Sequence, residues 1–234
     1  MLTLHRAAFV LPDPADPAAP SLPDGAVLVR GEQVEAVGPY PELAAAHPGA
    51  RVRDWGPGSL LAPGLRHPSG HRLLERDYHP DPREGVGVEP VADGLVGCAD
   101  EARFGASARR GLQRMLGYGV TAVAGPFERA AVRTAVARSG LAVLPSAAGA
   151  VGALDPLAVL PFAEAVHGRV AAGGRADFAV FPVVPVFPVV PVVPVVPVVP
   201  VQGVVDGSGE GRPGPAAGGC LATVLGGRLV YRRR

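Results

Sequence analysis

Apolar and polar side chains alternate along residues 25–38, and Gly31 lies near the middle of this segment. Successive strand residues point to opposite faces of a sheet, so a period of two around a glycine predicts a β-hairpin. A short helical turn over 41–47 and a strand over 51–54 are predicted next, followed by the apolar segment 60–62. The first quarter of the chain is therefore expected to be mainly β-structure.

A helical period replaces this alternation over residues 101–118. Apolar side chains recur there every three or four positions and form one stripe, which is typical of an amphipathic helix. A buried strand over 120–124, a helix over 129–138 and a second strand over 141–144 are predicted after it. The order strand, helix, strand favours parallel pairing of the two strands.

The segments that flank this region have weaker patterns. Residues 66–98 show no sustained period and are rich in proline, glycine and charged residues, so they predict an extended loop. A helix over 157–170 and a strand over 177–181 are expected, and the chain is expected to close with a hairpin over 222–231 that turns at two glycines. Strands at both ends of the chain thus enclose a β/α middle.

Proline recurs at every third position from Pro182 to Pro200. Residues 178–201 contain no charged residue and are long enough to span a bilayer, but each proline removes a helical donor and excludes a membrane helix. A period of three predicts polyproline II for the repeat 182–201. We interpret it as a tolerated repeat in a surface loop rather than a stalk for a proline-recognising partner, because it lacks polar flanks.

Composition limits the chemistry that the chain can perform. The 22 cationic residues are all arginine, so no lysine can act as an amine nucleophile or, once carboxylated, bridge two metal ions. The formal net charge of +1 provides no broad field for phosphate backbones, and we therefore expect no nucleic acid partner.

The cysteines and the N-terminal residues bear on location. Cys98 and Cys220 are far apart and form no CxxC pattern, so they are expected to be free thiols in a reducing compartment. Pro12 interrupts the short apolar run at the N-terminus, which differs from a secretory signal. We expect a cytoplasmic protein with no membrane contact, in which His5 and His47 are surface residues.

Three places in the chain resemble the amidohydrolase superfamily, particularly its imidazolonepropionase-like members. The first is the hairpin 25–38 followed by LLAPGL at residues 60–65, and the second is ARRGLQRMLGYGVTAVAG at residues 108–125. The third combines GGRADFAVF at residues 173–181 with ATVLGGRLVYR at residues 222–232. In this family, the segment before the barrel forms a small β-sandwich with the C-terminal segment.

The resemblance implies a fold class of α/β plus β. A small composite β-sandwich formed by the N- and C-terminal segments is expected around a truncated (β/α) amidohydrolase-type barrel fragment, since too few residues remain for eight strands and eight helices. We expect residues 1–62 and 171–234 to form the sandwich, interrupted by the repeat 182–201. Residues 63–170 are expected to form the barrel-like region.

The chain departs from the family at the metal site. After PGL, the family pattern leads to His-x-His, whose imidazoles hold a metal, but this chain has Ser69, Gly70 and His71 at those positions. A serine hydroxyl is a poor zinc ligand compared with imidazole, and a catalytic zinc site uses about three protein ligands. The resemblance therefore implies a degenerate site.

A second arrangement of ligands is possible in the loop over 66–98. His67, His71 and His79 lie there among several carboxylates, and together they could hold one zinc or iron ion. Residues Pro68 and Gly70 are expected to break the helix that would bring the first two histidines onto one face. The alternating charge is more typical of a solvated loop, and the same holds for an acid/base pair among the carboxylates Glu75, Asp77 and Glu84.

We therefore expect an amidohydrolase-like protein, nominally a hydrolase acting on non-peptide C–N bonds, with a degenerate catalytic site and no assignable catalytic residue. One alternative is an active mononuclear-metal C–N hydrolase or deaminase that uses His71 and the acidic loop. A second is a non-enzymatic module that presents the polyproline-like stalk. The expected partners are a small nitrogen-containing metabolite and, through unpaired strand edges, a second copy of the chain.

Overall fold

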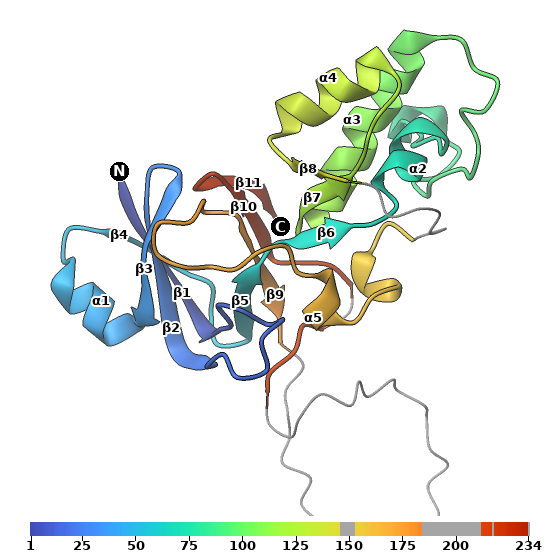
Figure 1. The fold of residues 1–234 in the computed structure, drawn as a ribbon. Helices are drawn as coiled ribbons and strands as arrows, with labels where there is room; N and C mark the ends of the chain where they lie inside the picture. The colour runs from blue at the N-terminus through green and yellow to red at the C-terminus, as the bar shows by residue number, and fades with distance from the viewer. Residues whose placement is uncertain (146–152, 184–211, 217, 234) are drawn as a thin grey trace, which may run out of the picture.

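The computed structural model describes residues 1–145, 153–183, 212–216 and 218–233. The strands of these residues form two sheets (Figure 1). The larger sheet contains eight strands from both ends of the chain, and the smaller contains three strands from its middle. The chain therefore leaves the first sheet, builds the second and returns to the first.

Strand β1 (Leu2–Val10) lies inside the larger sheet. The strand order is β11 (Arg228–Arg232), β10 (Ala222–Leu225), β9 (Phe178–Pro182), β5 (Ser59–Pro63), β1, β2 (Leu22–Arg30) and β3 (Gln33–Pro39), and β4 (Arg51–Asp54) also pairs with β1. One edge of β1 pairs with β2, and the other pairs first with β4 and then with β5. The sequence did not predict β1, because its burial does not alternate strictly and its apolar run is short.

The elements predicted for the first quarter of the chain are confirmed. Strands β2 (Leu22–Arg30) and β3 (Gln33–Pro39) form the antiparallel hairpin, and Gly31 between them has a φ of 61°, which favours glycine. Helix α1 (Tyr40–Ala46) and strands β4 (Arg51–Asp54) and β5 (Ser59–Pro63) follow. The structure starts β2 three residues before the predicted hairpin.

The C-terminal strands join the same sheet, as the resemblance implied. Strand β9 (Phe178–Pro182) pairs antiparallel with β5, and β10 (Ala222–Leu225) joins β9 to β11 (Arg228–Arg232). The hairpin turns at the two predicted glycines. The terminal segments thus share one sheet, whereas a sandwich arrangement and the domain limits stay predictions.

The smaller sheet is parallel, as the strand, helix, strand pattern predicted. Its strands are β6 (Leu65–His67), β7 (Val120–Ala124) and β8 (Ala142–Leu144). Helices α3 (Glu101–Gly117) and α4 (Ala130–Ser139) connect them and pack against each other (Figure 1). Asp100 begins α3 by accepting a hydrogen bond from the amide of Ala102.

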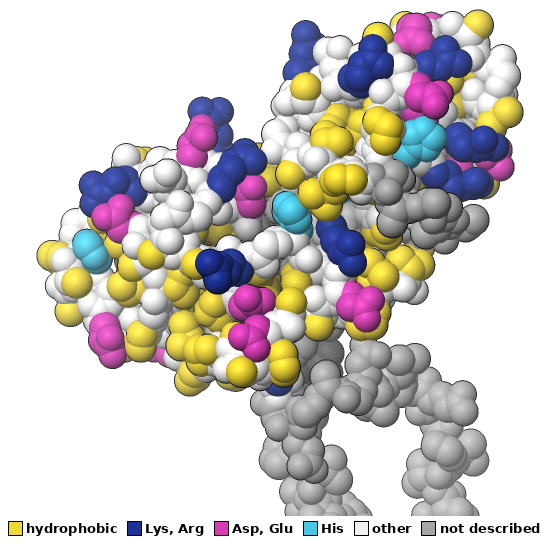
Figure 2. Space-filling model, viewed as in Figure 1, with side chains coloured by type: hydrophobic (Ala, Val, Ile, Leu, Met, Phe, Trp, Pro, Cys, Tyr) yellow, Lys and Arg dark blue, Asp and Glu magenta, His cyan; other side chains and the backbone are white. Residues whose placement is uncertain are grey.

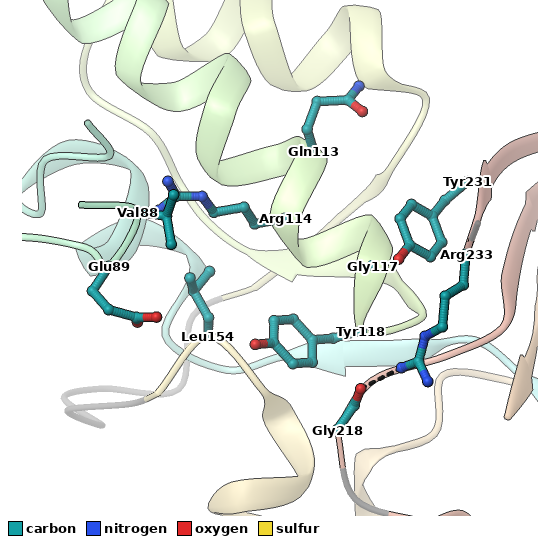
Figure 3. Close-up of a pocket in the computed structure, with 10 residues that line it drawn as sticks. All are labelled: Val88, Glu89, Gln113, Arg114, Gly117, Tyr118, Leu154, Gly218, Tyr231 and Arg233. Atoms are coloured by element: carbon teal, nitrogen blue, oxygen red, sulfur yellow. Dashed lines mark hydrogen bonds between the residues drawn. The ribbon is translucent and has the colours of Figure 1, made fainter. Parts of the chain in front are cut away.

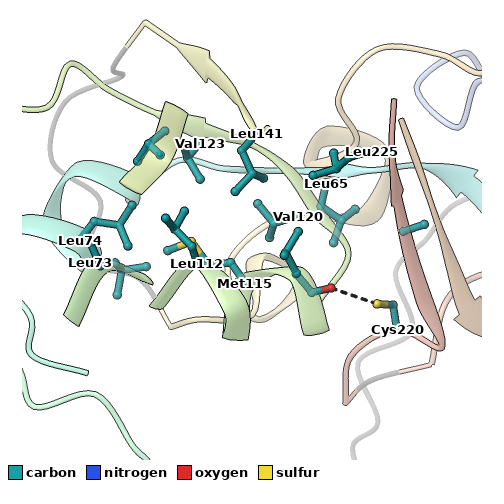
Figure 4. Packing of buried hydrophobic residues seen from close by; sticks show 14 of the residues in the cluster. Leu65, Leu73, Leu74, Leu112, Met115, Val120, Val123, Leu141, Cys220 and Leu225 are labelled. Carbon is teal, nitrogen blue, oxygen red and sulfur yellow. Dashed lines mark hydrogen bonds between the residues drawn. The ribbon is translucent and has the colours of Figure 1, made fainter. Parts of the chain in front are cut away.

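The two sheets share one hydrophobic core. Figure 4 shows Leu112 and Met115 of α3 in the same cluster as Cys220 and Leu225 of the larger sheet. The end of α3 is also held by this sheet, because the backbone amide of Cys220 donates to the carbonyl of Gly117 and the Thr223 hydroxyl donates to that of Leu116. Both cysteines are free, as predicted, and Cys220 is buried.

Two of the predicted elements are wrong. The segment 66–98 is not one extended loop, since it contains helix α2 (Gly70–Glu75) and a short 3-10 helix (Pro82–Glu84). The predicted helix 157–170 is reduced to a 3-10 turn (Pro156–Ala158) and the four-residue helix α5 (Phe162–Ala165). Pro161 separates these two because its ring cannot continue a helix into the preceding turn.

The repeat beyond Val183 lies outside the described residues, so its predicted polyproline conformation is untested. No helix in the described ranges has the length and apolar character needed to cross a bilayer. On the face shown in Figure 2, arginine and acidic side chains are interspersed over both parts of the molecule.

His5 corrects a further expectation, because it is a core residue and not a surface one. Its side chain in β1 is 1% exposed, and its ring stacks on Trp55 and meets the edge of Phe178. Burial, with a smaller contribution from the charge of Arg53, lowers the pKa of His5 to about 3. The native state therefore holds His5 neutral.

We predict that stability falls as the pH falls through the window from about 6.5 to about 3. Below pH 6.5 the unfolded chain binds a proton at His5 that the native state does not, at a cost of up to about 1.4 kcal/mol per pH unit. Urea unfolding at a series of pH values should show a flatter dependence in His5→Phe. His47→Gln should keep the wild-type slope, and an equal slope in His5→Phe would contradict this account.

Gly64 lies between β5 of the larger sheet and β6 of the smaller sheet, and its backbone packs closely against β7. This contact allows a test of how the packing between the two sheets contributes to stability. A Cβ at this position would lie 2.0 Å from the Cγ2 methyl of Thr121 in β7. We predict that Gly64→Ala lowers the free energy of unfolding by about 1 to 3 kcal/mol, since a packed core resists added volume. Gly49→Ala, where no atom lies within 4 Å of the added Cβ, is the control. A Gly64→Ala protein that melts at the wild-type temperature would refute the prediction.

Candidate functional site

The residues at the positions of the His-x-His dyad lie at the start of helix α2. Ser69 is the N-cap residue, and Gly70 and His71 are the first two helical residues. The predicted break is confirmed, because His67 belongs to β6 and no helix joins it to His71. Helix α2 begins only at Gly70, whose missing side chain lets it start against β7, because a Cβ there would lie 2.8 Å from the Ala124 carbonyl oxygen.

His71 points away from the interior of the fold. Its side chain is 40% exposed, and its Nε2 lies 3.1 Å from a carboxylate oxygen of Glu75, one helical turn later. The carboxylate of Glu75 is buried and also accepts a hydrogen bond of 2.7 Å from the backbone amide of Arg129. Glu75 therefore connects α2 to the start of α4, and His71 covers it from the solvent side.

His67 is fully buried at the end of β6, and both of its ring nitrogens are in use. The amide of Ser69 donates to Nδ1 at 3.2 Å, so Nε2 carries the proton and donates to the Ala153 carbonyl at 3.0 Å. Burial lowers the pKa of His67 to about 4. The neutral imidazole therefore serves as a bridge between two backbone segments, and neither nitrogen has a free lone pair.

His79 is also buried, in the loop that follows α2. Its Nε2 lies 2.8 Å from the Leu73 carbonyl and must donate to it, while Nδ1 has no hydrogen-bond partner among the described residues. Burial is the main cause that lowers the pKa of His79. Gly111 of α3 leaves room for the ring, because a Cβ there would lie 2.6 Å from Nε2.

The carboxylates of this region have separate structural partners. Asp77 is buried and accepts a hydrogen bond from the amide of Asp93, and Glu84 accepts one from the Tyr78 hydroxyl at 2.5 Å. The expectation of a solvated loop is thus wrong for Glu75 and Asp77, as it is for His67 and His79. The sequence pattern shows charge but not the backbone amides that these side chains bind.

The three histidines have different surroundings, on β6, on α2 and in the following loop. Within the part of the chain that the structure describes, no group of three His, Cys, Asp or Glu side chains could hold a metal ion. A zinc or iron ion at His67, His71 and His79 stays a prediction. To form this site, His67 would have to release one of its two hydrogen bonds.

A cavity of about 530 Å³ lies elsewhere, at the end of helix α3. Figure 3 shows Glu89, Arg114 and Leu154 at one end of it and Tyr231 and Arg233 at the other. The sequence did not predict it, because its walls come from five separate segments of the chain and no local motif joins them.

We predict different effects for the two residues of the α2 pair. Glu75→Ala should lower the free energy of unfolding by about 1 to 3 kcal/mol, because it leaves the Arg129 amide without its acceptor. His71→Ala should cost well under about 1 kcal/mol, as is usual for an exposed ion pair. Chemical denaturation of both variants tests this, and a larger loss in His71→Ala than in Glu75→Ala would contradict it.

Comparison with known proteins gives one family and several solved structures. The family model of the bacterial imidazolonepropionase-like composite domain matches residues 25–50. No curated protein sequence matches the chain.

Among the similar solved structures is a guanine deaminase from Bradyrhizobium japonicum, with 20% identity and a TM-score of 0.43 over 61% of this chain and 34% of that one. An adenosine deaminase from Xanthomonas campestris with bound zinc has 21% identity and a TM-score of 0.45 over 61% and 33%. An ochratoxinase from A. niger has 20% identity and a TM-score of 0.42 over 62% and 30%.

The chain spans about a third of the length of these solved structures. The family match covers β2 from Gly25 onward, β3 and α1, and thus includes the hairpin that is part of the first place of resemblance. The suspected resemblance to the imidazolonepropionase-like proteins is therefore supported by the match of residues 25–50 to their composite domain.

Proposed function

We propose that this chain is an amidohydrolase-like binding protein that holds no catalytic metal at the dyad position. One observation carries the proposal, namely that Ser69 and His71 lie on the first turn of a helix and not on a strand. Alternate residues of a strand point to the same side, whereas residues two apart on a helix point in widely different directions. The two side chains thus have no common metal to bind.

The chemistry of the residues supports the same conclusion. The serine hydroxyl is a weaker zinc ligand than the imidazole that it replaces, and catalytic zinc needs about three protein ligands. The buried imidazole nearest in sequence, His67, uses both ring nitrogens for backbone hydrogen bonds. His71 is paired with Glu75, which itself serves the backbone of the α4 segment.

A binding role is consistent with a fold whose buried polar side chains form hydrogen bonds within the protein and need no metal ion to hold them. Glu75 and His67 are held by backbone groups, so their burial is compensated by hydrogen bonds of the protein itself, and Nε2 of His79 donates to the Leu73 carbonyl. We propose a small nitrogen-containing metabolite as the ligand and the cytoplasm as the location.

Metal analysis of the full chain, purified without chelator, tests this proposal. We expect far less than one zinc or iron ion per chain by inductively coupled plasma mass spectrometry, and no change in His71→Ala. His47→Ala serves as the matched control, because this histidine lies in a different part of the sequence, after α1.

One zinc or iron ion per chain that is lost in His71→Ala and kept in His47→Ala would overturn the proposal. It would support instead a mononuclear-metal hydrolase or deaminase acting on C–N bonds. Adding zinc to the purified protein and repeating the assay after gel filtration distinguishes a weak site from an absent one, since only a specific site retains the metal.

A further inference from the structure

The cavity at the end of α3 is lined by parts of the chain that are far apart in sequence. Arg114 and Tyr118 come from the end of α3 and the turn after it, and Glu89 comes from the loop before α3. Tyr231 comes from β11 of the larger sheet, and Leu154 from the segment after β8. The cavity thus lies where the two sheets meet, which is a common place for a ligand site.

Arg114 has no counter-ion in the described part of the chain. No carboxylate lies within 4.0 Å of its guanidinium, and its Nη1 is shielded from solvent without a hydrogen-bond acceptor. A shielded cationic donor without an acceptor is unfavourable, so an anion that enters the cavity would gain from this charge.

A second cavity, beside β1, also contains an arginine, but this arginine has counter-ions. Its arginine, Arg6, already binds the carboxylates of Asp24 and Asp54 at 2.7 and 3.1 Å. These three side chains satisfy one another, so that cavity offers no unmatched charge. The arginine at the end of α3 is different because its charge is left for a ligand.

Glu89 and Tyr118 place two further polar groups beside Arg114. The carboxylate of Glu89 is at the exposed rim of the cavity and has no ion pair among the described residues. Burial, followed by the charges of Asp155 and Glu89, raises the pKa of Tyr118, so its hydroxyl stays protonated and can donate. Figure 3 shows this hydroxyl directed to the end of the cavity where Glu89 and Leu154 lie.

The rest of the cavity suits a flat apolar group. The ring of Tyr118 lies along the cavity, and the side chains of Val88, Leu154 and Tyr231 supply further apolar surface (Figure 3). Its volume of about 530 Å³ is in the range that small-molecule sites occupy, and it exceeds the size of a single amino acid.

We propose that this cavity binds a free α-amino acid with a flat apolar side chain. Its carboxylate meets the guanidinium of Arg114, its ammonium group meets the carboxylate of Glu89, and its side chain lies against Tyr118. An α-amino acid carries opposite charges on two groups attached to the same carbon, which matches a cation and an anion placed at one end of the cavity. The inference rests on the proposed binding role and names its site and its ligand class.

Titration of the full chain with L-phenylalanine, followed by protein NMR shifts, tests the site. Two analogues separate the charges, since 3-phenylpropanoate lacks the amine and phenethylamine lacks the carboxylate. We expect L-phenylalanine to bind at least tenfold more tightly than either analogue. Equal affinity for all three compounds would overturn the proposal.

Variants assign the two charges to their residues. Glu89→Gln should weaken binding of L-phenylalanine at least fivefold and leave 3-phenylpropanoate unchanged, and Arg114→Gln should weaken L-phenylalanine and leave phenethylamine unchanged. Glu128→Gln and Arg109→Gln, which lie outside this cavity, should bind as the wild type does. Arg114→Lys keeps the charge and should retain part of the affinity for L-phenylalanine. Comparison of the two variants therefore distinguishes loss of the charge from a folding defect in Arg114→Gln.

Unchanged affinity in both Glu89→Gln and Arg114→Gln would also overturn the proposal. Metal analysis of the same samples decides the proposed function separately. One metal ion per chain with amino acid binding intact would refute the metal-free function alone, and metal-free protein that binds none of the compounds would refute the amino acid site alone.

Discussion

The close contact between Gly64 and Thr121 fixes how the two sheets of this protein meet. Strand β5 belongs to the larger sheet and β6 to the smaller, and only Gly64 separates them. Because the chain passes so close to β7 at this point, the strands that follow are placed directly against the larger sheet. The common core of α3, β7 and the C-terminal strands depends on this passage.

A second close approach to β7, at Gly70, determines where the side chain of His71 points. Gly70 allows helix α2 to begin against the end of β7, and the helix then carries His71 outward to Glu75. The buried His67 is left to connect the backbone at Ser69 and Ala153. In this fold the ring nitrogens of His67 hold backbone groups, and Arg114, which has no counter-ion among the described residues, lies in the last turn of α3.

The sequence predicted local elements well where a single period repeats. The hairpin around Gly31, helix α3 and the parallel strands β7 and β8 all follow from apolar spacing within one segment. It failed where contacts between distant segments decide the outcome. Three different strands pair with β1, and His5 is buried by Trp55 and Phe178 from other segments.

The contacts in the candidate site could not be predicted from the sequence for the same reason, because they join distant segments. The composition of residues 66–98 indicated histidines and carboxylates, but it could not indicate that Glu75 accepts from Arg129 or that His67 binds Ala153. The cavity at Arg114 and Tyr118 was also invisible, since its residues share no spacing. Hydrogen bonds to remote backbone groups leave no periodic trace in a sequence.

The end of helix α3 has a consequence for how the chain matures. The Leu116 carbonyl accepts from the nearby amide of Gly119 and also from the Thr223 hydroxyl, and the Gly117 carbonyl accepts from the amide of Cys220, more than a hundred positions later. During synthesis, the hydrogen bonds from Thr223 and Cys220 can form only after these two residues have left the ribosome. The middle segment and the C-terminal strands are thus one cooperative unit, completed only when the final hairpin docks.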